Sequence, residues 1–147
     1  MNYGIQEVFM NEVLMNYFSG RSSDIWLGLG LSYEGANTNL DDFIEPEAGT
    51  GYSKQPFVCG AASGGVCYNA NEIAFDIATK DWTTNGRVID KVGIFKRTVT
   101  TSVENEQTEI FTLWCVLPLN PVETVVAGDT VIINANAIRL QLTNKGA

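Results

Sequence analysis

The sequence predicts a mainly β fold: a single jelly-roll-like β-sandwich domain over residues 1–147 that carries one N-terminal α-helix. Apolar residues alternate with other residues over much of 24–143, and turn-forming residues interrupt them at intervals of about 8–12 residues, which is typical of sandwiches and barrels. The size agrees, because a chain of 147 residues that is 45% hydrophobic suits one domain with its own core.

Residues 2–19 contain the only helix that the sequence predicts. Apolar side chains fall near one stripe, and Gly20 is a natural stop. The stripe is broad, which suits a helix with its own domain on one side and a neighbouring chain on the other. We therefore expect assembly contacts here; a helix that packs only on its own domain is the alternative. The expected contact residues are Ile5, Val8, Phe9, Leu14 and Phe18.

The β region begins at 24–34, DIWLGLGLSYE, where Ile and Leu alternate with Trp and Gly. Glycines at alternate positions indicate that another backbone comes close to this strand. Pro56 restricts the strand in YSKQPFVC to an edge or a bulge. Residues 87–119 predict a long hairpin with a polar tip at 104–106.

The stretch NEIAFDIATKDW, residues 71–82, predicts a buried strand and its exit turn. Ile73, Phe75 and Ile77 occupy alternate positions, and the strand ends before Trp82. We expect Trp82 to fold over the sheet and close one end of the sandwich, while Asp81 accepts hydrogen bonds from backbone N–H groups of the exit loop. Gly128 and Asp129 predict a tight turn into a late strand.

The charge balance disfavours nucleic acid as a partner. Asp and Glu total 17 against 9 Lys and Arg, a net charge of -8, and this surface repels phosphate backbones. No apolar run approaches the roughly 18 residues of a membrane span. The N-terminus lacks a basic start, and Glu7 and Glu12 interrupt it, so we expect no signal peptide and synthesis in a cytosol. Cys59, Cys67 and Cys115 are expected as thiols there.

The residue types of the chain disfavour catalysis. The chain has no histidine, which excludes Ser-His and Cys-His catalysis and histidine metal sites within it. It has no CxxC pair and no phosphate-binding glycine loop. We therefore predict no catalytic residue, no cofactor and no metal site, and a protein that is not an enzyme.

Three interpretations stay open. The acidic loop LDDFIEPE, with Asp41, Asp42, Glu45 and Glu47, is either a solvated loop or a calcium site. If residues 62–64 close a hairpin, Cys59 and Cys67 stand about opposite each other, either as buried thiols or as a bridge formed after release from the cell. The Trp and Tyr residues pack in the core or at interfaces, or they form a sugar-binding platform.

The order of several motifs resembles a known family. The motifs are IWLGLGLS, EPEAGTGYSKQPF, AASGGVCYNANEIAFDIATKDW, VGIF and VVAGDTVIINANAIRLQLT, and they span nearly the whole chain. Together they resemble small tailed-bacteriophage virion proteins, which are described as tail fibre or minor tail proteins and in some phages as head decoration. The residues that carry the resemblance are Tyr52, Phe75, Asp81, Trp82, Phe95, Gly128 and Asp129.

The sequence departs from this family at three places. Thr83 stands where the family favours glycine, Lys96 stands where aspartate is common, and the hairpin over 98–109 is longer than expected. The long hairpin is a candidate for this protein's own contact with a neighbour. The resemblance implies a non-enzymatic structural virion protein, made in the host cytoplasm, that assembles with copies of itself in a closed ring such as a trimer and with capsid or tail proteins. The alternative is a module that binds a host-surface glycan.

Overall fold

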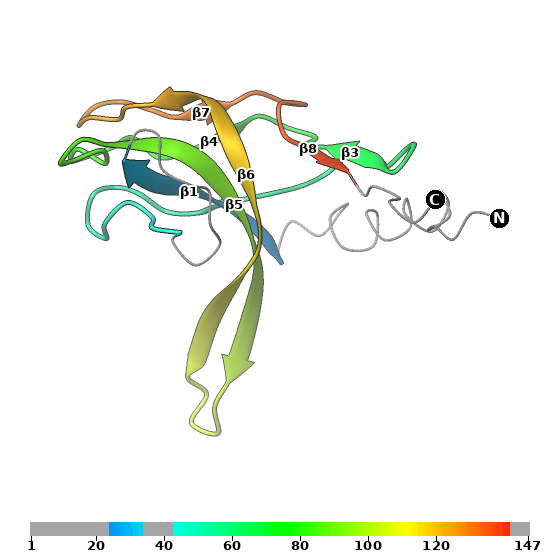
Figure 1. Cartoon of the computed structure of the whole chain (residues 1–147). Coiled ribbons are helices and arrows are strands. Elements are labelled where there is room, and N and C mark those ends of the chain that lie inside the picture. Colours follow the sequence, from blue (N-terminus) through cyan, green and yellow to red (C-terminus); the bar gives the residue numbers. More distant parts are fainter. Residues whose placement is uncertain (1–23, 34–42, 142–147) are drawn as a thin grey trace. The chain divides into compact units, whose positions relative to one another are not determined.

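The computed structural model describes residues 24–33 and 43–141; residues 1–23, 34–42 and 142–147 lie outside the description (Figure 1). Within the described ranges the protein is mainly β with antiparallel sheets, which confirms that part of the predicted fold class. The strands in chain order are β1 (Ile25–Tyr33), β2 (Gln55–Pro56), β3 (Val66–Tyr68), β4 (Ile73–Ala74), β5 (Arg87–Thr101), β6 (Gln107–Glu123), β7 (Ile132–Ile133) and β8 (Arg139–Gln141).

The described strands form three sheets. One has four strands in the order β2-β1-β5-β6, and the other two pair β3 with β8 and β4 with β7. β2 contains Pro56 and stands at the end of the four-stranded sheet, where the proline predicts it. The predicted helix over 2–19 lies outside the described residues, and the sandwich stays a prediction. Nowhere in the described ranges is a helix long and apolar enough to cross a membrane.

The chain divides into two compact units that interleave along the sequence. Of the described residues, the larger unit contains 24–33, 43–56 and Ala74–Ile132, and with them the four-stranded sheet. The smaller unit contains Phe57–Ile73 and 133–141, and with them β3 and β8. The single domain over 1–147 stays a prediction.

Strand β1 lies inside the four-stranded sheet and is buried on both of its faces. Leu27 and Leu29 point to one face and are fully buried, opposite Ile94 and Val92 of β5. Because side chains alternate along a strand, the glycines between these leucines point to the other face. The alternation that the sequence shows at 24–34 therefore separates two different packing surfaces.

The glycine face of β1 is covered by side chains. A Cβ on Gly28 would lie 2.7 Å from Glu45 Oε1 and 2.9 Å from a ring carbon of Phe95. A Cβ on Gly30 would lie 2.7 Å from a ring carbon of Phe43. The glycines make room for these side chains. The prediction that a neighbouring backbone approaches here is therefore wrong.

The edge of β1 that faces away from β5 is closed by three different groups. Leu27 pairs with β2. Two residues further on, the N–H of Leu29 donates to the Tyr52 hydroxyl at 2.9 Å, and the N–H of Leu31 donates to the Ile44 carbonyl at 2.7 Å. The segment after residue 43 thus continues the hydrogen bonding of this edge where β2 ends.

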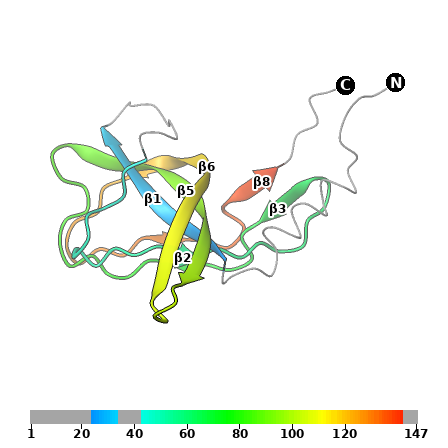
Figure 2. The ribbon, with the colours of Figure 1, turned by 90° about the horizontal axis from the view of Figure 1, so that it is seen from below.

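Strands β5 and β6 extend beyond β1 as a two-stranded ribbon, whose exposed residues 98–110 we call the arm (Figures 1 and 2). β1 pairs with β5 only as far as Lys96, and after it β5 pairs with β6 alone. At the tip, Ser102 N–H donates to the Glu106 carbonyl at 2.9 Å, and Asn105 has a positive φ of 62°. The predicted hairpin with a polar tip at 104–106 is confirmed.

The stretch 71–82 differs from the single buried strand that its pattern predicts. Only β4 is a strand within it. Phe75 is buried as expected, but the Ile77 side chain is 61% exposed and Ala78 is buried in its place. The chain changes direction here because its backbone bonds to separate loops: Ala78 N–H donates to the Asp129 carbonyl and Thr79 N–H to the Thr50 carbonyl.

The smaller unit is organised around a buried asparagine. Asn69 is fully buried, and its side-chain amide donates to the carbonyls of Asn71 and Asn134, each at 2.9 Å. Its side-chain oxygen accepts the N–H of Ile138 at 2.8 Å. Asn69 therefore holds the turn at 134–138 in place and satisfies polar groups that would be costly to bury alone.

Candidate functional site

Three aromatic residues that carry the family resemblance meet at one place in the larger unit. The Tyr52 ring is stacked on Phe75, with centroids 6.1 Å apart, and meets the edge of Trp82 at 5.4 Å. Trp82 is buried, and its indole N–H donates to the Thr50 carbonyl at 2.9 Å. The sequence separates these residues by up to thirty positions, and the fold joins them into one cluster.

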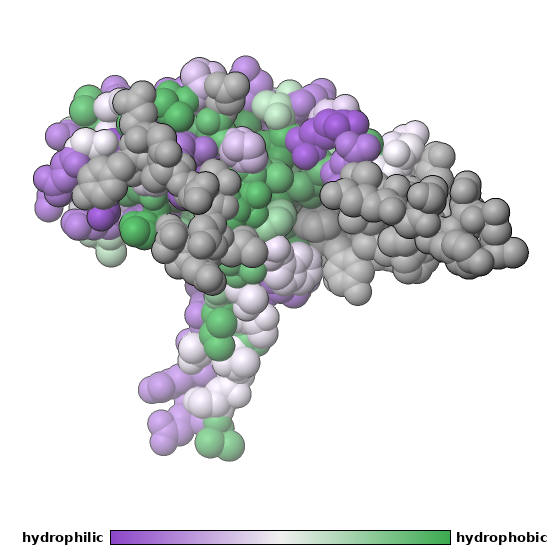
Figure 3. Space-filling view, in the orientation of Figure 1, coloured by the Kyte–Doolittle hydropathy of each residue, from purple (hydrophilic) through white to green (hydrophobic). Residues whose placement is uncertain are grey.

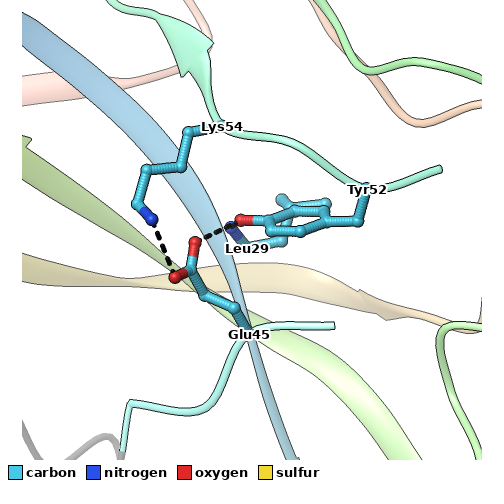
Figure 4. Close-up of polar contacts among 4 residues, drawn as sticks. All are labelled: Leu29, Glu45, Tyr52 and Lys54. Atoms are coloured by element: carbon cyan, nitrogen blue, oxygen red, sulfur yellow. Dashed lines mark hydrogen bonds and ion pairs between the residues drawn. The ribbon is translucent and has the colours of Figure 1, made fainter. Parts of the chain in front are cut away.

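The polar end of Tyr52 belongs to a chain of hydrogen bonds (Figure 4). Its hydroxyl donates to Glu45 Oε1 at 2.6 Å, and Lys54 Nζ lies 2.9 Å from Glu45 Oε2. Burial and the nearby Glu45 carboxylate raise the pKa of Tyr52 far above its ordinary value. Tyr52 therefore stays protonated and donates to Glu45 at any physiological pH.

Lys54 joins this cluster to the base of the arm. Its ammonium lies 4.6 Å from the ring centroid of Phe95 and 4.5 Å from that of Phe111, and its charge attracts both rings. The two rings meet edge to face at 6.4 Å. The family residue Phe95 thus lies between the Tyr52 cluster and the arm.

The remaining family residues form turns. Asp81 Oδ1 accepts the N–H of Ala127 at 2.9 Å, so Asp81 bonds to a distant loop and not to the exit loop in which the sequence predicted its partners. Gly128 has a φ of 94°, which favours glycine, and Asp129 Oδ2 accepts the N–H of Val126 at 3.0 Å. The tight turn predicted at these two residues is confirmed.

The Tyr52 cluster, meaning Tyr52, Phe75 and Trp82 with the hydrogen-bonded Glu45 and Lys54, is suited to holding loops together. The Tyr52 hydroxyl, the Glu45 carboxylate, the Lys54 ammonium and the Trp82 indole each contact another protein group. Beside it, Glu123, Thr124, Asp129 and Thr130 line part of an open hollow of about 390 Å³. Asp129 already accepts the N–H of its own turn there, and this favours a structural role for the carboxylate.

The acidic loop is described only in part. Asp41 and Asp42 lie outside the described residues. The Glu45 carboxylate accepts hydrogen bonds from the Tyr52 hydroxyl and the Lys54 ammonium. Glu47 is exposed. In the part of the chain that the structure describes, no group of three Cys, Asp or Glu side chains could hold a metal ion. The calcium interpretation is not tested for the whole loop.

The three cysteines are free, and Cys59 and Cys67 are buried. Cys59 pairs with Asn69 across the hairpin, so Cys67 lies diagonally to Cys59. The sequence predicted the two cysteines about opposite each other, and this prediction is wrong. The two thiols still share a hydrogen bond, which together with burial raises the pKa of Cys59. Burial also raises the pKa of Cys115.

The aromatic residues do not share one environment. Trp82 is buried and Trp26 is half-buried, where its ring meets that of Phe111 edge to face at 6.0 Å. Trp114 and Tyr68 are 39% and 41% exposed. Among the described residues, the tryptophans thus range from buried to well exposed, and the exposed Trp114 and Tyr68 are on β6 and β3.

The arm is a candidate contact surface, and it contains the long hairpin over 98–109 that departs from the family resemblance and was expected to contact a neighbour. The expected contacts Ile5, Val8, Phe9, Leu14 and Phe18 lie outside the described residues. The arm itself exposes Val99, Ile110 and, at its tip, the whole side chain of Val103. Figure 3 shows hydrophobic and hydrophilic side chains mixed along this ribbon. Alternating β-branched residues indicated the hairpin, but no sequence signal separated its distal half from the sheet.

Comparison with protein-family models, with curated proteins and with solved structures finds no match to this chain. The resemblance to phage virion proteins therefore depends on the motifs alone and stays a hypothesis.

Proposed function

We propose that this chain is a non-enzymatic structural component of a tailed-bacteriophage virion, of the tail fibre, minor tail or capsid-decoration type. It assembles through contacts with copies of itself and with capsid or tail proteins, after synthesis in the host cytoplasm. The order of the sequence motifs supports the family, and the described structure supports a part whose role is to bind other proteins.

The observation that carries this proposal is the division of roles within the larger unit. Tyr52, Phe75 and Trp82 contact one another, and the polar atoms of Tyr52 and Trp82 are engaged by other protein groups. The arm, in contrast, exposes apolar side chains on a two-stranded ribbon. Such ribbons are only marginally stable in water by themselves, and exposed apolar surface of this kind is typical of a contact site. This combination favours a rigid body that presents a contact element.

The test is to locate the chain on particles. Antibodies raised against the full chain should label purified virions at a repeated position, and the chain should remain with the particles through density-gradient separation. A chain that is abundant in infected cells but absent from purified particles would refute the proposal. Deletion of residues 2–19 should weaken incorporation if the predicted helix makes assembly contacts.

The glycan-binding alternative makes a different prediction. A folded full chain should then bind discrete sugars on a glycan array, and binding should depend on an exposed ring such as Trp114. Retention on virions with no glycan signal favours the structural role, whereas a glycan signal that Trp114→Ala abolishes favours the alternative.

A further inference from the structure

Strand β6 ends the order of the four-stranded sheet, and its two halves differ in composition. The half nearer the C-terminus contains Pro118 and Pro121, which interrupt hydrogen bonding along an edge. Residues 107–113, QTEIFTL, which we call the β6 edge, contain no proline and a single charge, Glu109. Natural sheets usually protect an edge of this kind, so its plain composition needs an explanation.

The register shows which backbone groups of the β6 edge face away from β5. Arg97 N–H donates to the Asp24 carbonyl on the β1 side, whereas Ser102 N–H donates to the Glu106 carbonyl on the β6 side. The backbone N–H and C=O groups of successive residues point to opposite sides of a strand. Ile110 and Thr108, which are opposite Thr98 and Thr100, therefore bond to β5. The residues between them present their N–H and C=O groups outward: Gln107, Glu109, Phe111 and Leu113.

The charges of the arm favour binding of a second copy of the chain along this edge, in the antiparallel direction. From 98 to 110 the only charged residues are glutamates, and the nearest basic residues, Lys96 and Arg97, lie at the base. Two arms side by side in the same direction would align acidic tip with acidic tip. In opposite directions, the acidic tip of each arm lies along the base of the other, which is electrostatically complementary.

One register satisfies every outward-facing group of the β6 edge. With the two-fold axis between Glu109 and Phe111, Glu109 of each copy is opposite Phe111 of the other, and Gln107 is opposite Leu113. No carboxylate then stands opposite a carboxylate. Phe111 is opposite Arg97 within one copy, so Arg97, Phe111 and the second Glu109 lie in one row across the pair, on the face where Arg97 already contacts its own Glu109 at 2.5 Å.

We propose that two copies of this chain pair through residues 107–113 of β6, antiparallel and related by a two-fold axis, so that the four-stranded sheet continues from one copy into the next. The inference deepens the proposed function, on which it rests, by naming the surface and the geometry of self-assembly.

The first test compares matched proline variants of the full chain. Gln107→Pro with Glu109→Pro removes two outward N–H groups from β6, and Thr101→Pro with Val99→Pro removes the outward groups directly opposite on β5. Light scattering and sedimentation should find a dimer for the native chain and for the β5 variant. The β6 variant should show a dissociation constant raised at least about 10-fold, equal to about 1.4 kcal/mol.

The outcomes separate cleanly. A native chain that stays monomeric at its highest soluble concentration overturns the inference, as does a dimer that the β6 variant leaves intact or that both variants dissolve equally. Amide exchange gives a second measurement: Gln107, Glu109, Phe111 and Leu113 should gain protection as concentration rises, while Thr108 and Ile110 should not change.

A tip cysteine tests the orientation. In the antiparallel pair the two tips lie at opposite ends, so Val103→Cys should form no more intermolecular disulfide under a mild oxidant than the native chain does. Efficient cross-linking through this position would overturn the antiparallel arrangement. These solution measurements do not involve particles, so a monomeric chain that still labels virions would refute the β6 pairing and leave the proposed function standing.

Discussion

The side of β1 that faces away from β5 and the outer side of β6 differ in the groups that pair with them. Along β1, the outward groups of Leu27, Leu29 and Leu31 meet β2, the Tyr52 hydroxyl and the Ile44 carbonyl. Along the distal half of β6, the described residues supply no further strand. Among the described residues, the loops therefore complete the hydrogen bonding on the β1 side of the sheet and add no strand on the β6 side.

The family residues follow the same division. Tyr52, Phe75 and Trp82 lie together in the cluster from which the β1 edge is closed, and none of the residues that carry the resemblance lies in the arm. The longer hairpin, one of the departures from the family, is the arm itself. If the proposed function holds, the arm is the part of the chain that differs from its relatives.

The largest expected effect is the loss of Trp82. Trp82→Ala removes a buried ring and its bond to the Thr50 carbonyl, and we expect a loss of about 3–5 kcal/mol in the free energy of unfolding, measured by urea titration. Ile110→Ala on the exposed arm is the control, with an expected loss under about 0.5 kcal/mol. Equal losses would contradict the division between closed body and exposed arm.

Tyr52→Phe tests the closed edge with a smaller change. The ring stays, but Leu29 N–H loses its acceptor and Glu45 loses a donor, so we expect a loss of about 1–3 kcal/mol. The Leu29 amide should also exchange faster with solvent. Tyr68→Phe, on an exposed tyrosine, should change neither quantity. An unchanged Leu29 amide would show that the hydroxyl does not close this edge.

The same hydroxyl makes the protein sensitive to alkali. The pKa of Tyr52 is raised in the folded state above its ordinary value of 10.0, so its contribution is complete below pH 10.0 and is lost as the pH rises further. The slope from this one group is about 1.4 kcal/mol per pH unit. Cys59 and Cys115 act in the same direction, because their pKa values are raised too.

The difference between the native chain and Tyr52→Phe isolates the tyrosine, because both contain the cysteines. Urea titrations above pH 10 should give a shallower loss for the variant. Parallel slopes would mean that Tyr52 ionises as readily in the folded state as in the unfolded chain.

The smallest effect is expected in the arm. Glu109→Gln removes the ion pair with Arg97, and because both side chains are partly exposed the loss should be about 0.2–1 kcal/mol. Glu45→Gln is the matched change at the closed edge and should cost more, since Glu45 also accepts the Tyr52 hydroxyl. The reverse order would show that the arm carries more of the stability than its exposure indicates.

The sequence predicted local features well. The period-two pattern of β1, the edge position of Pro56, the hairpin tip at 104–106 and the turn at Gly128 each depend on neighbouring residues, and each is confirmed. The mainly β class follows from them. The helix over 2–19 and the sandwich stay predictions.

Features that depend on distant residues were not predictable from one sequence. The exposure of Ile77 follows from backbone bonds of Ala78 and Thr79 to loops far along the chain. The Tyr52–Glu45–Lys54 network requires the loop to lie on Gly28, and glycine alone cannot say whether a backbone or a side chain approaches. The exposure of the arm depends on where β1 ends, and the pattern of β5 does not record this.

The arm also bears on the order of folding. Its two strands are joined by a turn of five residues, Ser102 to Glu106, whereas the partners of β1 residues on β5 are more than fifty positions away. Local hairpins close in about 1–10 μs, and distant pairings are slower. The ribbon can therefore form on a growing chain before its body closes.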